Sequence, residues 1–188
     1  MNIKVDISNV RLETERLILR PWTREDLDDF YEYAKVDGVG QMAGWCPHKS
    51  KEESATILNM FIAEQKTFAV VLKASHKAIG SVGLEEVREE TMLASPLKGR
   101  EIGYVLSKDY WGHGFMPEAV KRVVEYCFDD LGCDFLLCGY FKWNHQSQRV
   151  CEKIGFQFFK EIEFATRFNT FEKTNLNIMY HPKKVIRQ

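Results

Sequence analysis

Hydrophobic and polar positions recur with two periods along the chain, and these periods predict its helices and strands. Apolar residues at every third or fourth position indicate amphipathic helices, and short apolar or alternating runs indicate strands. The predicted helices cover residues 23–36, 50–64, 117–131 and 147–154. The predicted strands cover residues 16–21, 68–72, 78–87, 101–106, 134–140, 156–164 and 173–180. This order describes a mixed α/β chain.

Residues at the helix ends support these bounds. Thr23 with Asp26, and Ser50 with Glu53, have the spacing of capping boxes. Ser147 is the expected N-cap of the last helix, and Gly155 follows it where a helix commonly ends. Loops are expected at residues 37–48 and 89–98. The strand-turn-helix-strand section over residues 101–140 should form a right-handed parallel crossover.

Composition favours one globular domain over residues 1–188, with a core at 12–180 and a basic tail at 182–188. Hydrophobic residues make up 45% and charged residues 28% of the 188 positions, which is typical of a globular protein. A net charge of −1 gives no long-range attraction to nucleic acid or anionic membrane. The sequence has no apolar run of membrane-spanning length and no signal peptide. We therefore expect a cytoplasmic protein without nucleic acid or membrane as partner.

Cysteine usage agrees with that location. The chain has five cysteines and no C-x-x-C pair, so neither a zinc site nor a redox dithiol is indicated. We expect reduced thiols, several of them in the core, and no metal.

A turn with two glycines joins the strand at 101–106 to the helix that follows. A helix N-terminus has unsatisfied N–H groups and a positive dipole end, and Gly112 and Gly114 let an anion approach the backbone. Pro117 lacks an N–H, but the amides from Gly112 to Met116 remain available. The turn is neither a dinucleotide fingerprint nor a P-loop. By itself it indicates a tight turn or an anion site.

Two further segments narrow these alternatives. The motifs RLETERLILRPWTREDLDDFY, EIGYVLSKDYWGHGFMPEAV and NHQSQRVCEKIGF together resemble the GCN5-related N-acetyltransferase superfamily. Among its branches, the chain is most similar to ribosomal-protein alanine N-acetyltransferases, over residues 12–180. The resemblance implies an α/β acyl-CoA N-acyltransferase fold. Such a fold has a mixed, mostly antiparallel sheet of about seven strands with a splayed parallel pair, flanked by about four helices.

The resemblance implies acetyl-coenzyme A as co-substrate. The strand at 101–106 should carry a bulge, and its backbone at Tyr104, Val105 and Leu106 should contact the pantetheine arm. Asn144 should bond the same arm. The amides that should hold the pyrophosphate are those of Gly112, His113, Gly114, Phe115 and Met116. Asp109 departs from the Gln or Arg of the family pattern, so the backbone rather than this side chain should bind the phosphates.

Attack of an amine on a thioester needs a base, an oxyanion donor and a proton for the leaving thiolate. Glu101 is the candidate base, or else a structural hydrogen-bonding partner at the sheet end. A backbone N–H near Leu106 is the candidate oxyanion donor. Many superfamily members have a tyrosine acid where this chain has Cys151. Ser147 is therefore the candidate group near the sulfur, in addition to its capping role.

The acceptor is left open between a protein N-terminus and a small amine. Trp45 and His48 lie in the loop that the resemblance assigns to the acceptor wall. Their plainer readings are a buried tryptophan and a surface histidine. The chain is expected to be a monomer or homodimer. The alternative function is a coenzyme A-binding module that has lost catalysis, and Asn144, Ser147 and the glycine turn argue against it.

Overall fold

The computed structural model describes residues 1–91 and 96–184, and the strands found there form one eight-stranded sheet in the order β1-β2-β3-β4-β5-β6-β8-β7. The strands are β1 (Leu12–Glu13), β2 (Leu17–Pro21), β3 (Thr67–Leu72), β4 (Lys77–Glu85), β5 (Gly99–Leu106), β6 (Phe135–Phe141), β7 (Gln157–Ala165) and β8 (Phe171–Tyr180). The helices are α1 (Leu27–Ala34), α2 (Lys51–Glu64), α3 (Phe115–Asp129) and α4 (His145–Ile154). Short 3-10 turns are η1 (Arg24–Asp26), η2 (Gly40–Ala43), η3 (Glu89–Thr91) and η4 (Lys108–Tyr110). The α/β class, the mixed sheet and the four helices are as predicted.

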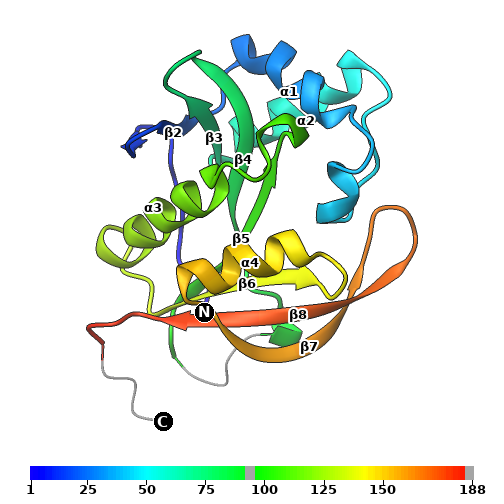
Figure 1. Ribbon diagram of the computed structural model, residues 1–188. Helices are drawn as coiled ribbons and strands as arrows, with labels where there is room; N and C mark the ends of the chain where they lie inside the picture. Colours follow the sequence, from blue (N-terminus) through cyan, green and yellow to red (C-terminus); the bar gives the residue numbers. More distant parts are fainter. Residues whose placement is uncertain (92–95, 185–188) are drawn as a thin grey trace.

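The sheet is antiparallel except between β5 and β6. These two strands pair in parallel from Gly99–Phe135 to Ile102–Cys138, and their pairing stops there. Residues Gly103 to Leu106 continue along β4 without a partner on the β6 side. The predicted splayed pair is therefore present, and its open edge lies in the middle of the sheet (Figure 1).

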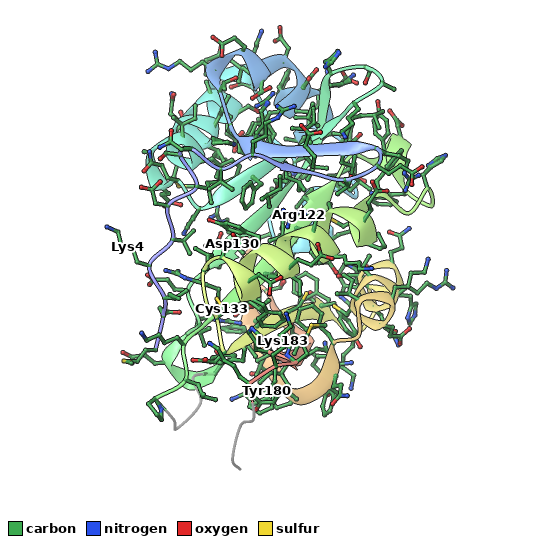
Figure 2. The ribbon with its side chains drawn as sticks, turned by 90° about the vertical axis from the view of Figure 1, so that its left-hand side faces the viewer. Lys4, Arg122, Asp130, Cys133, Tyr180 and Lys183 are labelled. Atoms are coloured by element: carbon green, nitrogen blue, oxygen red, sulfur yellow. The ribbon has the colours of Figure 1, made fainter. Side chains whose placement is uncertain are left out.

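Helices cover both faces of the sheet. Along β3, Phe68 and Val70 pack in the cluster that contains α3, whereas Ala69 and Val71 pack in the cluster that contains α1 and α2. Successive strand residues point to opposite faces, so the two helix pairs lie on opposite sides. Figure 1 shows α3 and α4 together on one face. In Figure 2, Arg122 lies along α3, and Asp130 and Cys133 mark the end remote from the glycine turn.

The capping residues act largely as predicted. Asp26 accepts hydrogen bonds from the Thr23 amide and hydroxyl, although this box opens the 3-10 turn η1 before α1 begins. The Ser50 hydroxyl accepts from the Glu53 amide at 3.2 Å and begins α2. Gly155 ends α4 with φ +99°.

Three expectations need correction. The N-cap of α4 is Asn144 and not Ser147, because the Asn144 side chain accepts from the Ser147 amide at 3.0 Å and the helix starts two residues earlier. The additional strand, β1, has two residues, too few for a periodic signal. The expected bulge in β5 is not seen in its pairing with β4, which stays regular from Glu85–Glu101 to Gly80–Leu106.

Two predicted segments fall partly outside the described residues: the loop at 89–98 and the basic tail at 182–188. Within the described ranges, no helix has the length and apolar character needed to cross a bilayer.

Candidate functional site

Two cavities lie against β5 and meet at Tyr104 and Val105, which line both. The first, called here the splay cavity, has a volume of about 310 Å³ and lies between the open edge of β5, the glycine turn and α4. The second, called the α2 cavity, has a volume of about 450 Å³ and lies over β3, β4 and β5 beneath α1 and α2. One strand, β5, therefore borders both cavities.

The glycine turn gives the splay cavity a row of free amides. Gly112 and Gly114 have φ of +81° and +78°, a backbone conformation that favours glycine. Within residues 1–91 and 96–184, no hydrogen bond leaves the N–H groups of residues 112–116. These amides lie at the start of α3, where the helix dipole favours negative charge. The arrangement fits a pyrophosphate group.

Side chains add charge around the turn. Arg149 and Lys153 of α4 line the splay cavity. Asp109 is exposed and is not among the residues that line it. The departure from the family pattern at this position therefore leaves no carboxylate in the cavity wall.

Arg16, the residue before β2, holds the glycine turn in place. Sequence reasoning missed this role. Its guanidinium donates to the His113 carbonyl at 3.0 Å and pairs with Glu118 of α3 at 2.7 Å. It also lies over the Phe115 ring, 4.3 Å from the centroid. Glu118 further accepts from the Thr14 hydroxyl at 2.5 Å. The segment before β2 is thereby fastened to the first turn of α3.

The side chain of Tyr104 is the main feature that sequence reasoning missed. Ile102, Tyr104 and Leu106 point to the α3–α4 face. The Tyr104 hydroxyl there lies 2.7 Å from Ser147 Oγ and 3.8 Å from Cys151 Sγ. Burial raises the pKa of Tyr104 well above its usual value. A protonated phenol and a hydroxyl therefore stand together at the wall of the splay cavity, next to the position where the family tyrosine is absent.

Cys151 is a core residue. It is buried, and its thiol lies 3.3 Å from the thiol of Cys138 on β6. This agrees with a packing role for Cys151.

Asn144 uses both ends of its amide within the protein. Its oxygen caps α4, and its nitrogen donates to the Met42 carbonyl at 3.2 Å. The side chain is buried and lines the splay cavity together with Met42. It therefore ties α4 to the η2 loop at the cavity edge.

Glu101 lies outside both cavity linings. It faces the same side of the sheet as Gly103 and Val105, directly opposite Glu85 of β4. Its carboxylate is 3.7 Å from the Arg88 guanidinium and is mostly buried. Glu101 can reach an amine in the α2 cavity only along this face of the sheet.

Trp45 and His48 both line the α2 cavity. The expectation of a surface histidine is wrong, because His48 is buried and its Nδ1 lies 2.7 Å from Ser54 Oγ. Burial lowers the pKa of His48, so the ring is neutral at physiological pH. Trp45 packs against His48 with ring centroids 5.1 Å apart. Both residues belong to a packed aromatic wall.

The floor of the α2 cavity is polar. Thr67, Ser81 and Glu85 come from β3 and β4, and Tyr33 reaches the cavity from α1. Sequence reasoning found none of these four, because none of them lies within a quoted motif.

Comparison with known proteins agrees with this geometry. The acetyltransferase (GNAT) domain family matches residues 16–157. The chain is 30% identical over 151 residues to YoaA, an uncharacterized N-acetyltransferase of Bacillus subtilis (strain 168), covering 78% of this chain and 82% of that protein. It is 26% identical, with the same coverage, to the uncharacterized N-acetyltransferase p20 of Bacillus licheniformis.

Solved structures share the fold. An acetyltransferase (GNAT family) from Bacillus anthracis superposes with a TM-score of 0.80 at 19% identity, over 93% of this chain and 100% of that one. The ribosomal-protein-S5-alanine acetyltransferase of Vibrio fischeri gives 0.74 at 22% identity, over 93% and 98%. With the family match spanning most of the sequence, the chain belongs to the acetyltransferase (GNAT) family.

Proposed function

We propose that this protein transfers the acetyl group of acetyl-coenzyme A to a primary amine while both molecules are bound. The observation that carries the proposal is the pair of cavities that meet at Tyr104 and Val105. Acetyl-coenzyme A belongs in the splay cavity and the amine in the α2 cavity. Transfer across one strand then needs no acetylated form of the enzyme.

The splay cavity fits the co-substrate at two points. The free amides of residues 112–116 suit the pyrophosphate. The unpaired edge of β5 from Gly103 to Leu106 suits the pantetheine arm, whose amides can pair with it as an added strand would. When bound, the thioester supplies an activated acetyl group. Asn144 supports this site by holding Met42 against α4.

The protein's own groups can manage the protons. We assign the phenol of Tyr104, with Ser147 beside it, as the donor to the leaving thiolate, because burial keeps this phenol protonated. Glu101 remains our candidate for receiving the amine proton through water along the sheet face. A free N–H on the open edge of β5 can stabilise the oxyanion.

The proposed acceptor is a primary amine, carried either by a protein N-terminus or by a small molecule. The Vibrio fischeri protein is named for an alanine of ribosomal protein S5. A protein N-terminus is therefore one option for this chain, and a small-molecule amine is the other.

The test is release of free thiol from acetyl-coenzyme A in the presence of a mixed panel of amines and peptides. We expect thiol release that depends on the acceptor, with equal formation of acetylated amine measured by mass spectrometry. Tight binding of acetyl-coenzyme A without turnover of any acceptor would instead identify a coenzyme A-binding module.

A further inference from the structure

The floor of the α2 cavity contains buried hydroxyls without partners. Thr67 Oγ1 and the Tyr33 hydroxyl are buried and make no hydrogen bond to any described residue. Tyr33 lies beside Ser81 without a hydrogen bond of good geometry. A buried polar group without a partner costs free energy, so such groups commonly mark a place where a ligand or water binds. Both residues line the cavity.

A carboxylate oxygen converges on the same place. A side chain at Gly83 would put its Cβ 2.9 Å from Glu85 Oε1 and 3.4 Å from Thr67 Oγ1. The missing side chain at Gly83 leaves room for the Glu85 carboxylate to lie over the floor. The other oxygen of Glu85 pairs with Lys66 at 2.7 Å, and Lys66 is not among the residues that line the cavity. One carboxylate oxygen therefore remains directed at the space above Gly83.

This arrangement selects a hydrogen-bond donor. A carboxylate only accepts, whereas the hydroxyls of Thr67 and Tyr33 can donate or accept. A ligand carboxylate at this place would be repelled by Glu85. An alcohol or an ammonium group can donate to Glu85 and also satisfy a hydroxyl.

The position of this donor site relative to the reaction follows from the strand register. Gly103 of β5 pairs with Gly83 of β4, and Gly83 pairs with Thr67 of β3. Thr67 thus lies two strand spacings, or roughly 10 Å, from the strand where transfer takes place. The cavity volume of about 450 Å³ is that of a small-molecule site.

We propose that the acceptor is a small primary amine with a second hydrogen-bond donor, which Thr67, Tyr33 and Glu85 bind at the far side of the α2 cavity. This rests on the proposed function. The second donor is a hydroxyl or a second ammonium group. The aromatic wall of Phe30, Trp45 and Phe61 covers the apolar chain between the two ends.

Three acceptors with the same six-carbon chain test this with the full protein at saturating acetyl-coenzyme A: hexylamine, 6-aminohexan-1-ol and 1,6-diaminohexane. A peptide with N-terminal alanine is the fourth. We expect kcat/KM for the amino alcohol or the diamine to exceed that for hexylamine about tenfold, the typical effect of one satisfied buried hydrogen bond. Comparing kcat/KM for the amino alcohol and the diamine shows whether the second donor is a neutral hydroxyl or a charged ammonium group.

Thr67→Val removes the hydroxyl while keeping the side-chain shape. We expect it to abolish the preference over hexylamine, through KM, without lowering the melting temperature. Glu85→Gln should reduce the preference in the same way. Glu64→Gln is its matched control, because Glu64 is the other carboxylate on Lys66 and does not line the cavity.

Equal kcat/KM for hexylamine and both bifunctional amines would overturn the inference, as would turnover of the peptide alone or a Thr67→Val variant with its preference intact. Failure to acetylate any of the four, despite binding of acetyl-coenzyme A, would overturn the proposed function itself. These two failures are therefore distinguishable.

Discussion

At the scale of single residues, Tyr104 stands out because it belongs to the linings of both cavities and its phenol is tied to α4. It contacts both the hydroxyl and the carbonyl of Ser147. A tyrosine buried in this way keeps its proton at any pH where the protein works, because burial disfavours the phenolate. The phenol can therefore donate a hydrogen bond to the leaving thiolate throughout that pH range.

Replacing Tyr104 with Phe removes this proton donor and little of the packing. We expect kcat to fall about a hundredfold, within the usual range for general acid catalysis, while the Kd for acetyl-coenzyme A stays close to that of the wild type. Steady-state thiol release and equilibrium binding measure the two quantities. Tyr180→Phe, at an exposed position on β8, is the control. A Tyr104→Phe enzyme with full kcat would remove the phenol from the mechanism.

The limits of sequence reasoning are clear at this scale. The tight turn at Gly112 and Gly114 could be predicted from the sequence, because two glycines between a strand and a helix are a local signal. The Tyr104–Ser147 contact could not, since it joins residues 43 positions apart through packing. The same holds for Thr67 and Tyr33, whose common feature is a missing partner.

At the scale of elements, the open edge of β5 and the N-terminus of α3 line one cavity around the glycine turn. Gly112 has open space where a Cβ would lie, and its backbone requires a positive φ. A large side chain there would enter the splay cavity, which Gly112 lines.

Gly112→Trp should therefore abolish binding of acetyl-coenzyme A at concentrations that saturate the wild type. Gly132→Trp is a matched control, because Gly132 also has a positive φ and open space but does not line the cavity. Both variants carry a similar backbone penalty of about 1 kcal/mol. Calorimetry measures the binding of acetyl-coenzyme A, and melting curves measure the stability of the fold, so loss of binding can be told apart from loss of stability. Normal binding by the Gly112 variant would refute the phosphate assignment of the turn.

The entry to α1 depends on the Arg20–Asp26 pair, which binds through two hydrogen bonds of 2.7 and 2.6 Å. Burial by itself would raise the pKa of Asp26, but hydrogen bonds from Arg20 and Thr23 outweigh it and the pKa is lowered. A carboxyl with a lowered pKa stabilises the fold above its unfolded pKa of about 3.9. That stability is lost as the pH falls through the lowered value.

We expect Asp26→Asn to lower the free energy of unfolding by about 2 kcal/mol at pH 7, below the full cost of a completely buried pair because Arg20 is partly exposed. The difference from the wild type should shrink below about pH 4, as the wild-type carboxyl takes up its proton. Urea unfolding at pH 7 and pH 3 measures this. Asp28→Asn, on an exposed residue, should change little. A difference independent of pH would contradict the electrostatic explanation.

The order of elements was predictable because capping residues and period both mark the helices, and the glycine turn marks the crossover from β5 to β6. Serine is a common N-cap, so the sequence predicts Ser147 as the capping residue of α4. In the structure Asn144 takes that position and also holds Met42. The regular β4–β5 register likewise depends on pairing that a single strand does not encode.

At the scale of the whole molecule, two cavities meet at β5, where Tyr104 and Val105 belong to both linings. The glycine turn and α4 line the splay cavity, α1, α2 and the end of β7 line the α2 cavity, and the η2 loop borders both. Such an arrangement predicts direct transfer between two bound substrates. It leaves the buried thiols of Cys138 and Cys151 without a role as acetyl carriers.

Direct transfer is tested most directly by following the enzyme after it is mixed with acetyl-coenzyme A alone. Intact-protein mass spectrometry and thiol release are measured before and after an amine is added. The account predicts no mass gain of an acetyl group and no burst of thiol until the amine is present, followed by equal formation of thiol and acetylated amine. A stable acetylated enzyme that forms without amine and then passes its acetyl group to the amine would contradict it.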